Sequence, residues 1–475
     1  MELLIVAWLA AAATPAAEIE ARVQRITGGL LPDTAFHARY GPPASLPDRM
    51  AYYKTPGVSI AVINEGRVEW TRGFGVRERG RPEPVTEHTL FQAGSISKPI
   101  FALAVMRLVQ EGRLDLDEDV NRYLRSWKVP ASGGWQPRVT LRQLLGHSAG
   151  LTVHGFPGYG SEEQVPTVVQ VLNGDPPANT SPVEVNRLPG VVFRYSGGGT
   201  TVGQLLVSDH LRLPFPRLMR ELVLDPLGMA DSTYEQPLPP ARATLAATAH
   251  PWKGRPLPGR FHVYPEMAAA GLWTTAADLA RAGVSVQEAY RAEGRSLLSS
   301  ATVKTMLTPS AASDEIGIGF FLEGEGPGAR FGHGGWDEGF VARATFYKER
   351  GQGAVVMINS NEGAPMLDEI LRAVAREYAW PGFFPEEKAA PASPDALQAF
   401  VGSYAAKSFS CTVTREGSRL FLQATTQPPL ELRPTAENTF RVVELDAEVV
   451  FDKADGAVKS LTLKQGGRET KAERK

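Results

Sequence analysis

Ser95 stands in a pattern that can support nucleophilic catalysis. It opens the tetrad Ser95-Ile96-Ser97-Lys98, which lies between a predicted β-hairpin and an apolar helical segment. Residues three apart on a helix share one face, so Lys98 could take the proton of the Ser95 hydroxyl. A lysine with the ordinary pKa of ~10.4 is protonated at neutral pH, so Lys98 can act as a base only if it is partly desolvated or lies beside another cation. The competing interpretation is a helix start with an exposed lysine.

Ser148 competes with Ser95 as the nucleophile. It is the serine of Gly-His-Ser-Ala-Gly at 146–150, which matches the Gly-x-Ser-x-Gly pattern of α/β-hydrolases. In those enzymes the serine occupies a sharp turn between a buried strand and a helix. Here residues 139–145 are typical of a helix that opens at Thr140, and residues 151–158 cannot form a helix. We therefore expect a loop at 146–150, and an α/β-hydrolase that uses Ser148 is the disfavoured alternative.

The hydrophobic pattern on either side of Ser95 predicts the elements that would position it. Residues 57–75 alternate between apolar and polar side chains around a turn at 64–66, which predicts a β-hairpin. A helical pattern then runs from about Lys98 to Gly112. Ser95 would therefore lie where a strand segment passes into a helix.

The middle of the chain, 115–310, is rich in proline, glycine and short helical patterns, such as 181–188 and 275–282. In the second of these, the tetrad from Thr275 to Asp278 is typical of a capping box. We therefore assign Asp278 a structural role and not a catalytic one.

Strand patterns return after residue 310, at 317–322, 330–332, 340–347 and 354–358, and a helical pattern follows at 365–378. Strands thus come first and last, with helices between them. This order predicts an α+β domain whose antiparallel sheet is built from both ends of the domain, with flanking helices and an inserted, mostly helical region. We place this domain at 18–380.

The character of the sequence changes after this domain. Residues 381–395 form a linker that is rich in proline and alanine. Residues 396–475 contain short alternating patterns at 411–414, 419–423, 430–433, 440–443, 449–451 and 461–464. They predict a small all-β module, either an antiparallel barrel or a sandwich.

Composition excludes several classes of protein. The 475 residues are 43% hydrophobic and 21% charged with a net charge of −2, which excludes disordered and polytopic membrane classes. A chain with this net charge has no overall positive electrostatic field that would attract the phosphates of a nucleic acid. Cys411 is the single cysteine, which excludes an intrachain disulfide and a cysteine-based zinc site, and the eight histidines show no metal-binding motif. We expect neither a cofactor nor a metal ion.

Residues 1–17 predict export. An apolar run at 3–13 is too short to cross a bilayer, and small residues follow it at 14–17, where a signal peptidase would cut. Glu2 precedes the run and no lysine or arginine does, which is atypical of a signal peptide. The alternative is a cytosolic protein with an apolar N-terminal helix. We expect a periplasmic or secreted protein with no membrane span in the mature chain.

Two more motifs follow the Ser-x-x-Lys tetrad. A Tyr-Ser-Gly motif begins at Tyr195 and a His-Gly-Gly motif begins at His333. With these three motifs the chain resembles, over about residues 20–380, the serine β-lactamase and penicillin-binding-protein superfamily. The branch related to class C β-lactamases, with its esterases, D-aminopeptidases and DD-peptidases, is the most similar. Shorter matches lie at 56–59, 91–95, 144–151, 225–229 and 270–275. The module at 396–475 resembles the lipocalin-like barrels appended to some members.

The resemblance implies roles for four side chains. Ser95 would attack a carbonyl carbon and form an acyl-enzyme. Lys98 and Tyr195 would share the general-base and general-acid work, with the tyrosine hydroxyl facing both the serine and the leaving group. His333 stands where many relatives have lysine and would bias the proton of Tyr195.

The resemblance also implies an oxyanion hole and a binding strand. The backbone N–H groups of Ser95 and Trp336 would stabilise the oxyanion, and one such donor contributes roughly 10²–10³ in rate. Gly334 and Gly335 would leave room for the substrate to lie along the strand.

Departures from the family pattern limit the expected substrate. Gly197 stands where β-lactamases and peptidoglycan enzymes usually have asparagine, and Gly334 stands where they usually have a hydroxyl residue that holds the substrate carboxylate. Both departures count against β-lactam turnover. Asp337 and Glu338 follow the glycines, and near the pocket they could hold a substrate ammonium; the competing interpretation is an exposed turn.

We therefore expect a serine hydrolase that acts on a small ester, amide or peptide through an acyl-enzyme. Esterase or D-amino-acid peptidase activity comes ahead of β-lactamase or DD-carboxypeptidase activity. The alternative is a non-catalytic envelope protein that binds peptides or glycans. The sequence leaves open the natural substrate and whether the chain forms a homo-oligomer.

Overall fold

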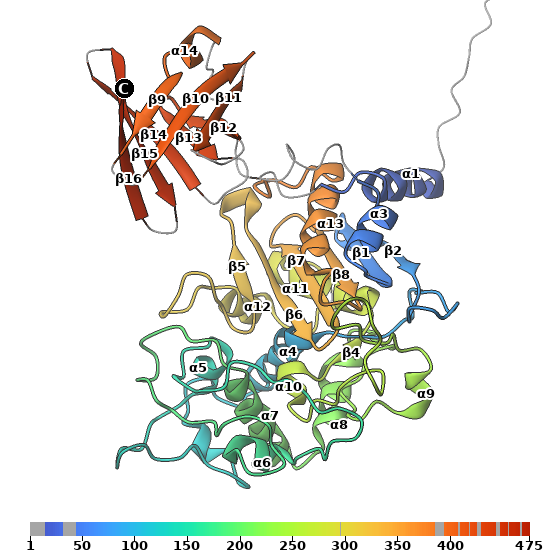
Figure 1. Cartoon of the computed structure of the whole chain (residues 1–475). Coiled ribbons are helices and arrows are strands. Elements are labelled where there is room, and N and C mark those ends of the chain that lie inside the picture. The colour runs from blue at the N-terminus through green and yellow to red at the C-terminus, as the bar shows by residue number, and fades with distance from the viewer. Residues whose placement is uncertain are drawn as a thin grey trace, which may run out of the picture. The chain divides into compact units, whose positions relative to one another are not determined.

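A computed structural model of the chain (Figure 1) describes residues 15–31, 44–294, 296–384, 394–406, 409–417, 419–424, 429–442, 447–454, 456–465 and 468–475. Two compact units are present: Met1–Gly29 with Ser45–Phe383, and Leu30–Ala44 with Phe384–Lys475. Of the predicted signal peptide, residues 1–14 lie outside the described residues, and 15–17 begin helix α1 (Pro15–Thr27). Most of the predicted linker, residues 385–393, also lies outside them.

A six-stranded antiparallel sheet forms the centre of the first unit, in the order β2-β1-β8-β7-β6-β5. Its strands are β1 (Gly57–Asn64), β2 (Arg67–Gly75), β5 (Phe321–Glu323), β6 (Arg330–Asp337), β7 (Phe340–Tyr347) and β8 (Gly353–Ile358). β1 and β2 form the predicted hairpin, and Val58 of β1 lies opposite Ile358 of β8. The prediction of one antiparallel sheet built from both ends of the domain is therefore confirmed.

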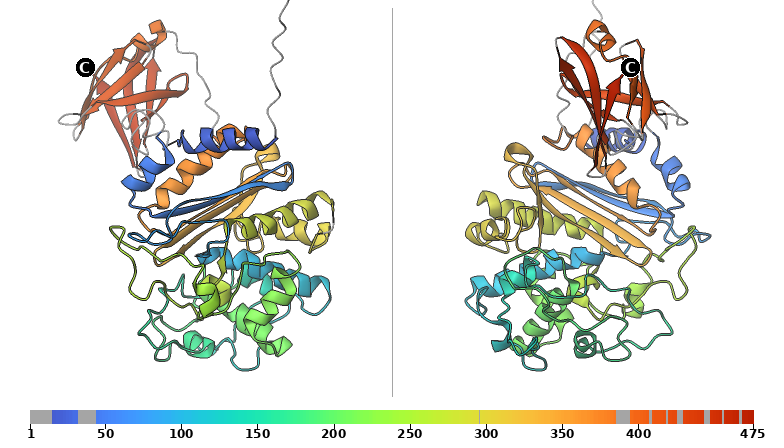
Figure 2. Two further views of the ribbon diagram at one scale, coloured as in Figure 1. Left: turned by 90° about the vertical axis from the view of Figure 1, so that its right-hand side faces the viewer. Right: turned by 60° about the vertical axis from the view of Figure 1, so that its left-hand side comes forward.

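Helices cover both faces of this sheet. α1 and α13 (Ala364–Glu377) lie on one face, and α11 (Ala276–Arg291) and α12 (Ser300–Met306) lie on the other, as Figure 2 shows. α3 (Leu46–Tyr52) precedes the sheet in the chain. β1 and β8 are buried along nearly their whole length because both faces are covered. α13 buries residues three and four apart, including Leu367, Ile370 and Val374, and packs against β7 and β8.

The predicted helical region lies between β2 and β5. Its longer helices, α4 (Ser97–Gln110) and α7 (Gly197–Leu211), are buried over most of their length. A short ribbon of β3 (Phe91–Gln92) and β4 (Trp273–Thr274) lies beside them. The remaining helical turns before β6 are η1 (Gly94–Ile96), η2 (Val120–Arg122), α5 (Leu141–Leu145), α6 (Val168–Asn173), α8 (Phe215–Met219), η3 (Arg220–Leu224), α9 (Pro240–Ala243), α10 (Met267–Ala270) and η4 (Gly326–Gly328).

One segment predicted as a helix is extended. In 181–188 the backbone N–H of Val183 donates to the carbonyl of Leu172 at 2.9 Å, and Val185 forms an isolated β-bridge with Leu151. Val183 and Val185 are both buried. Their spacing of two is the spacing of a strand face, and this pairing takes precedence over the weak helical pattern.

Two other local predictions are partly right. The strand predicted at 317–322 starts later, with β5, because Gly319 adopts a left-handed φ of +80°. The capping box predicted at the start of α11 is half formed. The Thr275 side chain accepts the backbone N–H of Asp278, but the Asp278 carboxylate accepts the hydroxyl of Ser232 at 2.8 Å. Asp278 is therefore structural, as predicted, through a different bond.

The second unit contains a closed barrel of eight antiparallel strands. The strands are β9 (Gly402–Ala405), β10 (Ser410–Glu416), β11 (Arg419–Ala424), β12 (Leu430–Ala436), β13 (Thr439–Val442), β14 (Ala447–Ala454), β15 (Ala457–Gln465) and β16 (Arg468–Arg474), and α14 (Pro394–Gln398) precedes them. β16 pairs with β9 and closes the barrel, which removes the free edges. Its core contains Phe440, Phe451 and Cys411, and burial raises the pKa of the Cys411 thiol to about 11. The all-β module is thus a barrel and not a sandwich.

Candidate active site

Ser95 lies in the turn η1, which joins β3 to α4. The Nζ of Lys98, in the first turn of α4, donates a hydrogen bond to the Oγ of Ser95 at 2.8 Å. Lys98 is 4% exposed, whereas Ser95 borders an open cleft. The structure therefore brings the serine and the lysine into direct contact, with the lysine on the buried side.

A second contact fixes the Lys98 side chain. Its Nζ also donates to the carbonyl oxygen of Ala269, in α10, at 2.8 Å. The same Nζ lies 5.0 Å from the centroid of the Tyr195 ring. The lysine thus connects the serine, the tyrosine and α10.

Ser97, the other serine of the tetrad, holds the turn in place. Its Oγ donates to the carbonyl of Gly94 at 2.6 Å and accepts the backbone N–H of Leu272 at 3.0 Å. The buried hydroxyl of Tyr234 donates to the carbonyl of Ser97 at 2.8 Å. The backbone that carries Ser95 is therefore fixed by buried hydrogen bonds on two sides.

Tyr195 directly precedes the N-cap of α7. The Ser196 side chain accepts the N–H of Gly199 at 2.9 Å and donates to the carbonyl of Thr152 at 2.7 Å, which satisfies one free donor of the helix start. Within the described residues the Tyr195 hydroxyl forms no hydrogen bond, so it is available to a substrate.

Four rings surround the Tyr195 ring. The centroid distances are 4.3 Å to His147, 4.9 Å to His154, 6.1 Å to His333 and 6.2 Å to Phe321, which is stacked with an interplanar angle of 13°. The tyrosine is therefore held in an aromatic and imidazole environment.

Two of these imidazoles are buried and neutral. The Nδ1 of His147 accepts the N–H of Ser196 at 3.2 Å, and the Nδ1 of His333 bonds to the carbonyl of Gly334 at 2.5 Å. Burial and the charge of Lys98 lower both imidazole pKa values, that of His333 to about 3. The Nε2 of His333 has no partner among the described residues. His333 can therefore influence a nearby proton only as a neutral imidazole with a free lone pair.

The turn η1 packs directly on the backbone of β6. A Cβ atom at Gly335 would lie 1.9 Å from the carbonyl oxygen of Ala93, and one at Gly94, which has a φ of +51°, would lie 2.4 Å from the backbone nitrogen of Trp336. Both positions therefore need glycine. This contact places the backbone amide of Trp336 beside the residue that precedes Ser95.

These elements border one cleft of about 730 Å³, whose walls include Ser95, Tyr195, His333, Gly334, Gly335 and Trp336. Of the residues predicted to form the site, these six line the cleft, and Lys98 lies behind Ser95. The Trp336 side chain is 53% exposed at the rim. The arrangement holds a nucleophile, two proton-carrying groups and a strand backbone around a single open space.

Asp337 does not line this cleft, contrary to our prediction. Alternation along β6 puts its side chain on the opposite face from Trp336, where it is 3% exposed. Burial raises the pKa of its carboxyl well above the usual value, and the charge of Lys98 opposes this shift. Asp337 is thus neither a substrate-binding carboxylate at the surface nor part of an exposed turn.

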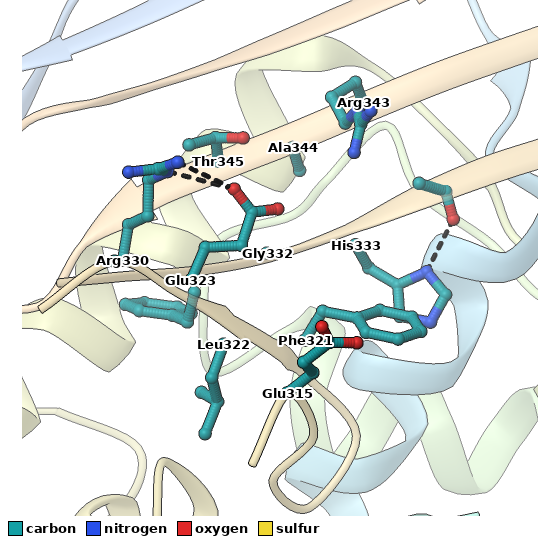
Figure 3. A pocket seen from close by; sticks show the side chains of 13 residues that line it. Glu315, Phe321, Leu322, Glu323, Arg330, Gly332, His333, Arg343, Ala344 and Thr345 are labelled. Atoms are coloured by element: carbon teal, nitrogen blue, oxygen red, sulfur yellow. Dashed lines mark hydrogen bonds and ion pairs between the residues drawn. The ribbon is translucent and has the colours of Figure 1, made fainter. Parts of the chain in front are cut away.

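A second cavity, of about 580 Å³, shares Phe321 and His333 with the cleft (Figure 3). It extends along β5, β6 and β7 to the ion pair between Arg330 and Glu323, whose atoms are 3.0 Å apart. The two cavities therefore adjoin at Phe321 and His333.

Ser148 is not part of the cleft. It is 7% exposed and lines a separate cavity of about 480 Å³. The helix predicted before it is α5, with a capping box at Thr140, so no strand leads into the serine. The sharp strand–helix turn of an α/β-hydrolase is absent here, and the sheet is antiparallel. The alternative that uses Ser148 is therefore wrong.

His147 and His154 are the site residues that the sequence does not single out. His147 lies inside the 146–150 motif, and His154 lies in the loop after it. The sequence feature that could have pointed to these residues is the occurrence of two histidines in and after the Gly-x-Ser-x-Gly motif at 146–150. Their proximity to Tyr195 depends on tertiary contacts.

Two global properties bear on function. Over the described ranges, no group of three or more His, Cys, Asp or Glu side chains is placed to hold a metal ion. No helix in the described part of the chain combines the length and the apolar character needed to cross a membrane.

Residues 44–379 match the family model "Beta-lactamase", and residues 386–474 match a "Domain of unknown function (DUF3471)". The first match spans more than half of the chain. The protein therefore belongs to the beta-lactamase family of serine hydrolases.

Among curated relatives, Esterase EstB of Burkholderia gladioli is 30% identical over 304 residues, which cover 58% of this chain and 74% of the esterase. A penicillin-binding protein of Bacillus subtilis is 23% identical over 445 residues, 88% of this chain and 94% of that protein. The solved structure of the octameric penicillin-binding protein homologue from Pyrococcus abyssi has a TM-score of 0.60 at 22% identity and covers 90% of this chain and 97% of that one. This likeness shows a shared fold.

Proposed function

We propose that the protein hydrolyses small esters or amides through an acyl-enzyme on Ser95. The observation that carries the proposal is the 2.8 Å hydrogen bond between the Nζ of Lys98 and the Oγ of Ser95, at the wall of a cleft that Tyr195 also borders. A serine that contacts a buried amine and faces open space is arranged for activation as a nucleophile.

The mechanism follows from these contacts. The Oγ of Ser95 bonds to the substrate carbonyl carbon as its proton passes to the pair formed by Lys98 and Tyr195. The backbone N–H groups of Ser95 and Trp336 meet the negative charge on the carbonyl oxygen. When this intermediate collapses, the bond to the leaving alcohol or amine breaks and the Tyr195 hydroxyl supplies the leaving group with a proton. A water molecule then cleaves the acyl-enzyme by the reverse proton path.

His333 completes this proposed assignment. Its neutral ring borders the cleft 6.1 Å from the Tyr195 ring, with the Nε2 lone pair free. Because the His333 ring carries no charge, it does not repel the proton of Tyr195. Among the groups that we assign to the reaction, Lys98 is then the one whose charge acts on that proton.

Ester and small-amide substrates are favoured over β-lactams by two positions. A Cβ atom at Gly197 would lie 3.0 Å from the Phe156 ring, so the asparagine usual in β-lactamases is absent and would need this ring to move. Gly334 has space for a side chain but offers no hydroxyl to a substrate carboxylate. The similarity to an esterase is in keeping with this substrate class. We also assign the chain, on its three motifs and the shorter matches, to the branch related to class C enzymes.

Covalent labelling tests the proposal. The purified protein is treated with a fluorophosphonate, and the modified peptide is identified by mass spectrometry. We expect the adduct on Ser95, its loss in Ser95→Ala, and its retention in Ser148→Ala. An adduct on another serine would contradict the assignment. An unlabelled protein that binds envelope peptides or glycans would support the non-catalytic alternative.

We further propose that residues 1–17 are removed as a signal peptide, so that the mature protein is periplasmic or secreted. The hydrolase domain would then span 18–380, the linker 381–395 and the barrel module 396–475. The division of the chain into two compact units near Phe383 and the two family matches support these boundaries. The N-terminal sequence of the exported protein and the sites of limited proteolysis test them. Light scattering tests self-association into a homo-oligomer.

A further inference from the structure

The loop that carries His154 is fastened to the start of α7. The backbone N–H of Gly197 donates to the carbonyl of His154, and the N–H of Gly198 donates to the carbonyl of Val153, both at 3.0 Å. The Ser196 hydroxyl donates to the carbonyl of Thr152 at 2.7 Å. Three consecutive carbonyl groups are thus bound by the helix that Tyr195 precedes.

These bonds hold an unfavourable backbone conformation. Val153 has a φ of +61°, which is rare for a β-branched residue. The turn at Val153 directs the next residue, His154, to the cleft wall that Ser95 and Tyr195 also form.

His154 differs from the other two imidazoles near Tyr195. His147 and His333 are buried, and each uses a ring nitrogen in a hydrogen bond. His154 is exposed, and its ring nitrogens form no hydrogen bond within the described part of the chain. Its ring lies 4.9 Å from the Tyr195 ring. It is therefore the imidazole whose donor and acceptor are both open to a molecule in the cleft.

The same loop occupies the space beside Gly197. A Cβ atom at Gly197 would lie 3.0 Å from the Phe156 ring and 3.1 Å from the carbonyl oxygen of His154. Gly197 itself offers no polar side chain to the substrate. From the loop at 152–156, the polar side chain that borders the cleft is the His154 imidazole.

We infer that His154 is a substrate-binding residue that hydrogen-bonds an amide group beside the scissile carbonyl. Its chemical target is an N-acylated amino-acid ester or amide, which lies between β6 and the loop at 152–156. This inference rests on the proposed hydrolysis at Ser95 and names the substrate class of that site. His154 would bind the substrate directly without taking the reacting proton.

Two esters of equal chain length test the inference, the p-nitrophenyl esters of N-acetylglycine and of pentanoic acid. Loss of one hydrogen bond to a bound amide changes affinity by about tenfold. We expect His154→Ala to lower kcat/KM about tenfold for the N-acetylglycine ester and to leave the pentanoate ester nearly unchanged. His154→Gln, which keeps a donor and an acceptor, should recover most of the loss.

Equal losses for both esters would overturn the inference and indicate that His154 acts through Tyr195. Unchanged kinetics for both esters would overturn it as well. Fluorophosphonate labelling of Ser95 in the wild type and in His154→Ala separates the two proposals. If Ser95 is labelled at the same rate in both proteins and the ester preference is unaltered, then only the role of His154 fails. If wild-type Ser95 is not labelled, then the proposed function itself fails.

Discussion

The Nζ of Lys98 lies 2.8 Å from the Oγ of Ser95 and 2.8 Å from the carbonyl oxygen of Ala269. The amine therefore has two oxygen partners, one on the reacting serine and one on α10. The second partner keeps the lysine beside the serine, and no carboxylate among the described residues contacts the amine directly. The position of the amine thus depends on α10, a helix far from α4 in the sequence.

Removal of the amine should therefore abolish most of the activity. We expect Lys98→Met to lower kcat for p-nitrophenyl acetate by about 10²–10⁴, the range typical of a lost general base. Lys98→Arg should not restore the rate, because a guanidinium stays protonated at working pH. Circular dichroism should show that both variants fold. Wild-type turnover by Lys98→Arg would show that the lysine acts only as a fixed charge.

A side chain at Gly335 should disrupt the contact between β6 and η1, whereas a side chain at Gly334 should not. In Gly335→Ala the new Cβ would lie 1.9 Å from the carbonyl oxygen of Ala93, so the strand and the turn must separate. We expect a loss of about 1–3 kcal/mol in the free energy of unfolding. We also expect kcat to fall by roughly 10² or more as the Trp336 amide is displaced. Urea unfolding and esterase kinetics measure the two effects.

Gly334→Ala is the matched control for that variant. Its Cβ would meet no atom closer than the carbonyl oxygen of Ala342, at 4.0 Å. This variant should keep wild-type stability and remain active. If both alanine variants behave alike, then the close approach of η1 to β6 does not explain why glycine occupies position 335.

The contact of Ser95 with Lys98 could be predicted because it is local. The spacing of three fixes both residues on one helical turn, and the hydrophobic pattern on either side marks where α4 starts. The sheet could be predicted for a similar reason, since alternating segments at 57–75 and 340–358 carry their own signal. Neither inference needs a contact between distant parts of the chain.

The face of Asp337 could not be predicted, because the sequence indicates a strand only at 330–332. The glycines at 334 and 335 weaken the strand pattern, although β6 continues to Asp337. The last strand of the predicted barrel, β16, could not be predicted for a related reason, since it contains a single apolar residue, Ala472. In each case pairing with a neighbouring strand supplies what the local pattern lacks.

Glu266 should make stability depend on pH. It precedes α10, is fully buried, and neither carboxyl oxygen has a partner among the described residues. Burial raises the pKa of its carboxyl to about 8, so between its ordinary value near 4.5 and pH 8 the folded protein binds a proton that the unfolded chain does not. The contribution of Glu266 is therefore complete below pH 4.5 and is lost as the pH rises through about 8.

Glu266→Gln should remove this dependence. We expect the free energy of unfolding of the wild type to fall by up to about 1.4 kcal/mol per pH unit over this range because of Glu266, and the variant to lack this component. Urea unfolding at pH 6 and pH 8.5 measures the difference, and the variant should be the more stable protein at pH 8.5. Parallel pH profiles for the two proteins would show that Glu266 titrates normally.

Ser196 should couple the stability of α7 to the position of His154. Ser196→Ala removes the cap of α7 and the bond to the Thr152 carbonyl, at a cost of about 0.5–2 kcal/mol. The loop at 152–154 then loses one of the three hydrogen bonds that hold it to the start of α7. We therefore expect kcat/KM for the N-acetylglycine ester to fall more than that for the pentanoate ester. Ser299→Ala, which removes the cap of α12, should destabilise the protein similarly without altering this preference. An equal shift in ester preference for both variants would show that general loosening of the fold, and not the loop, controls substrate choice.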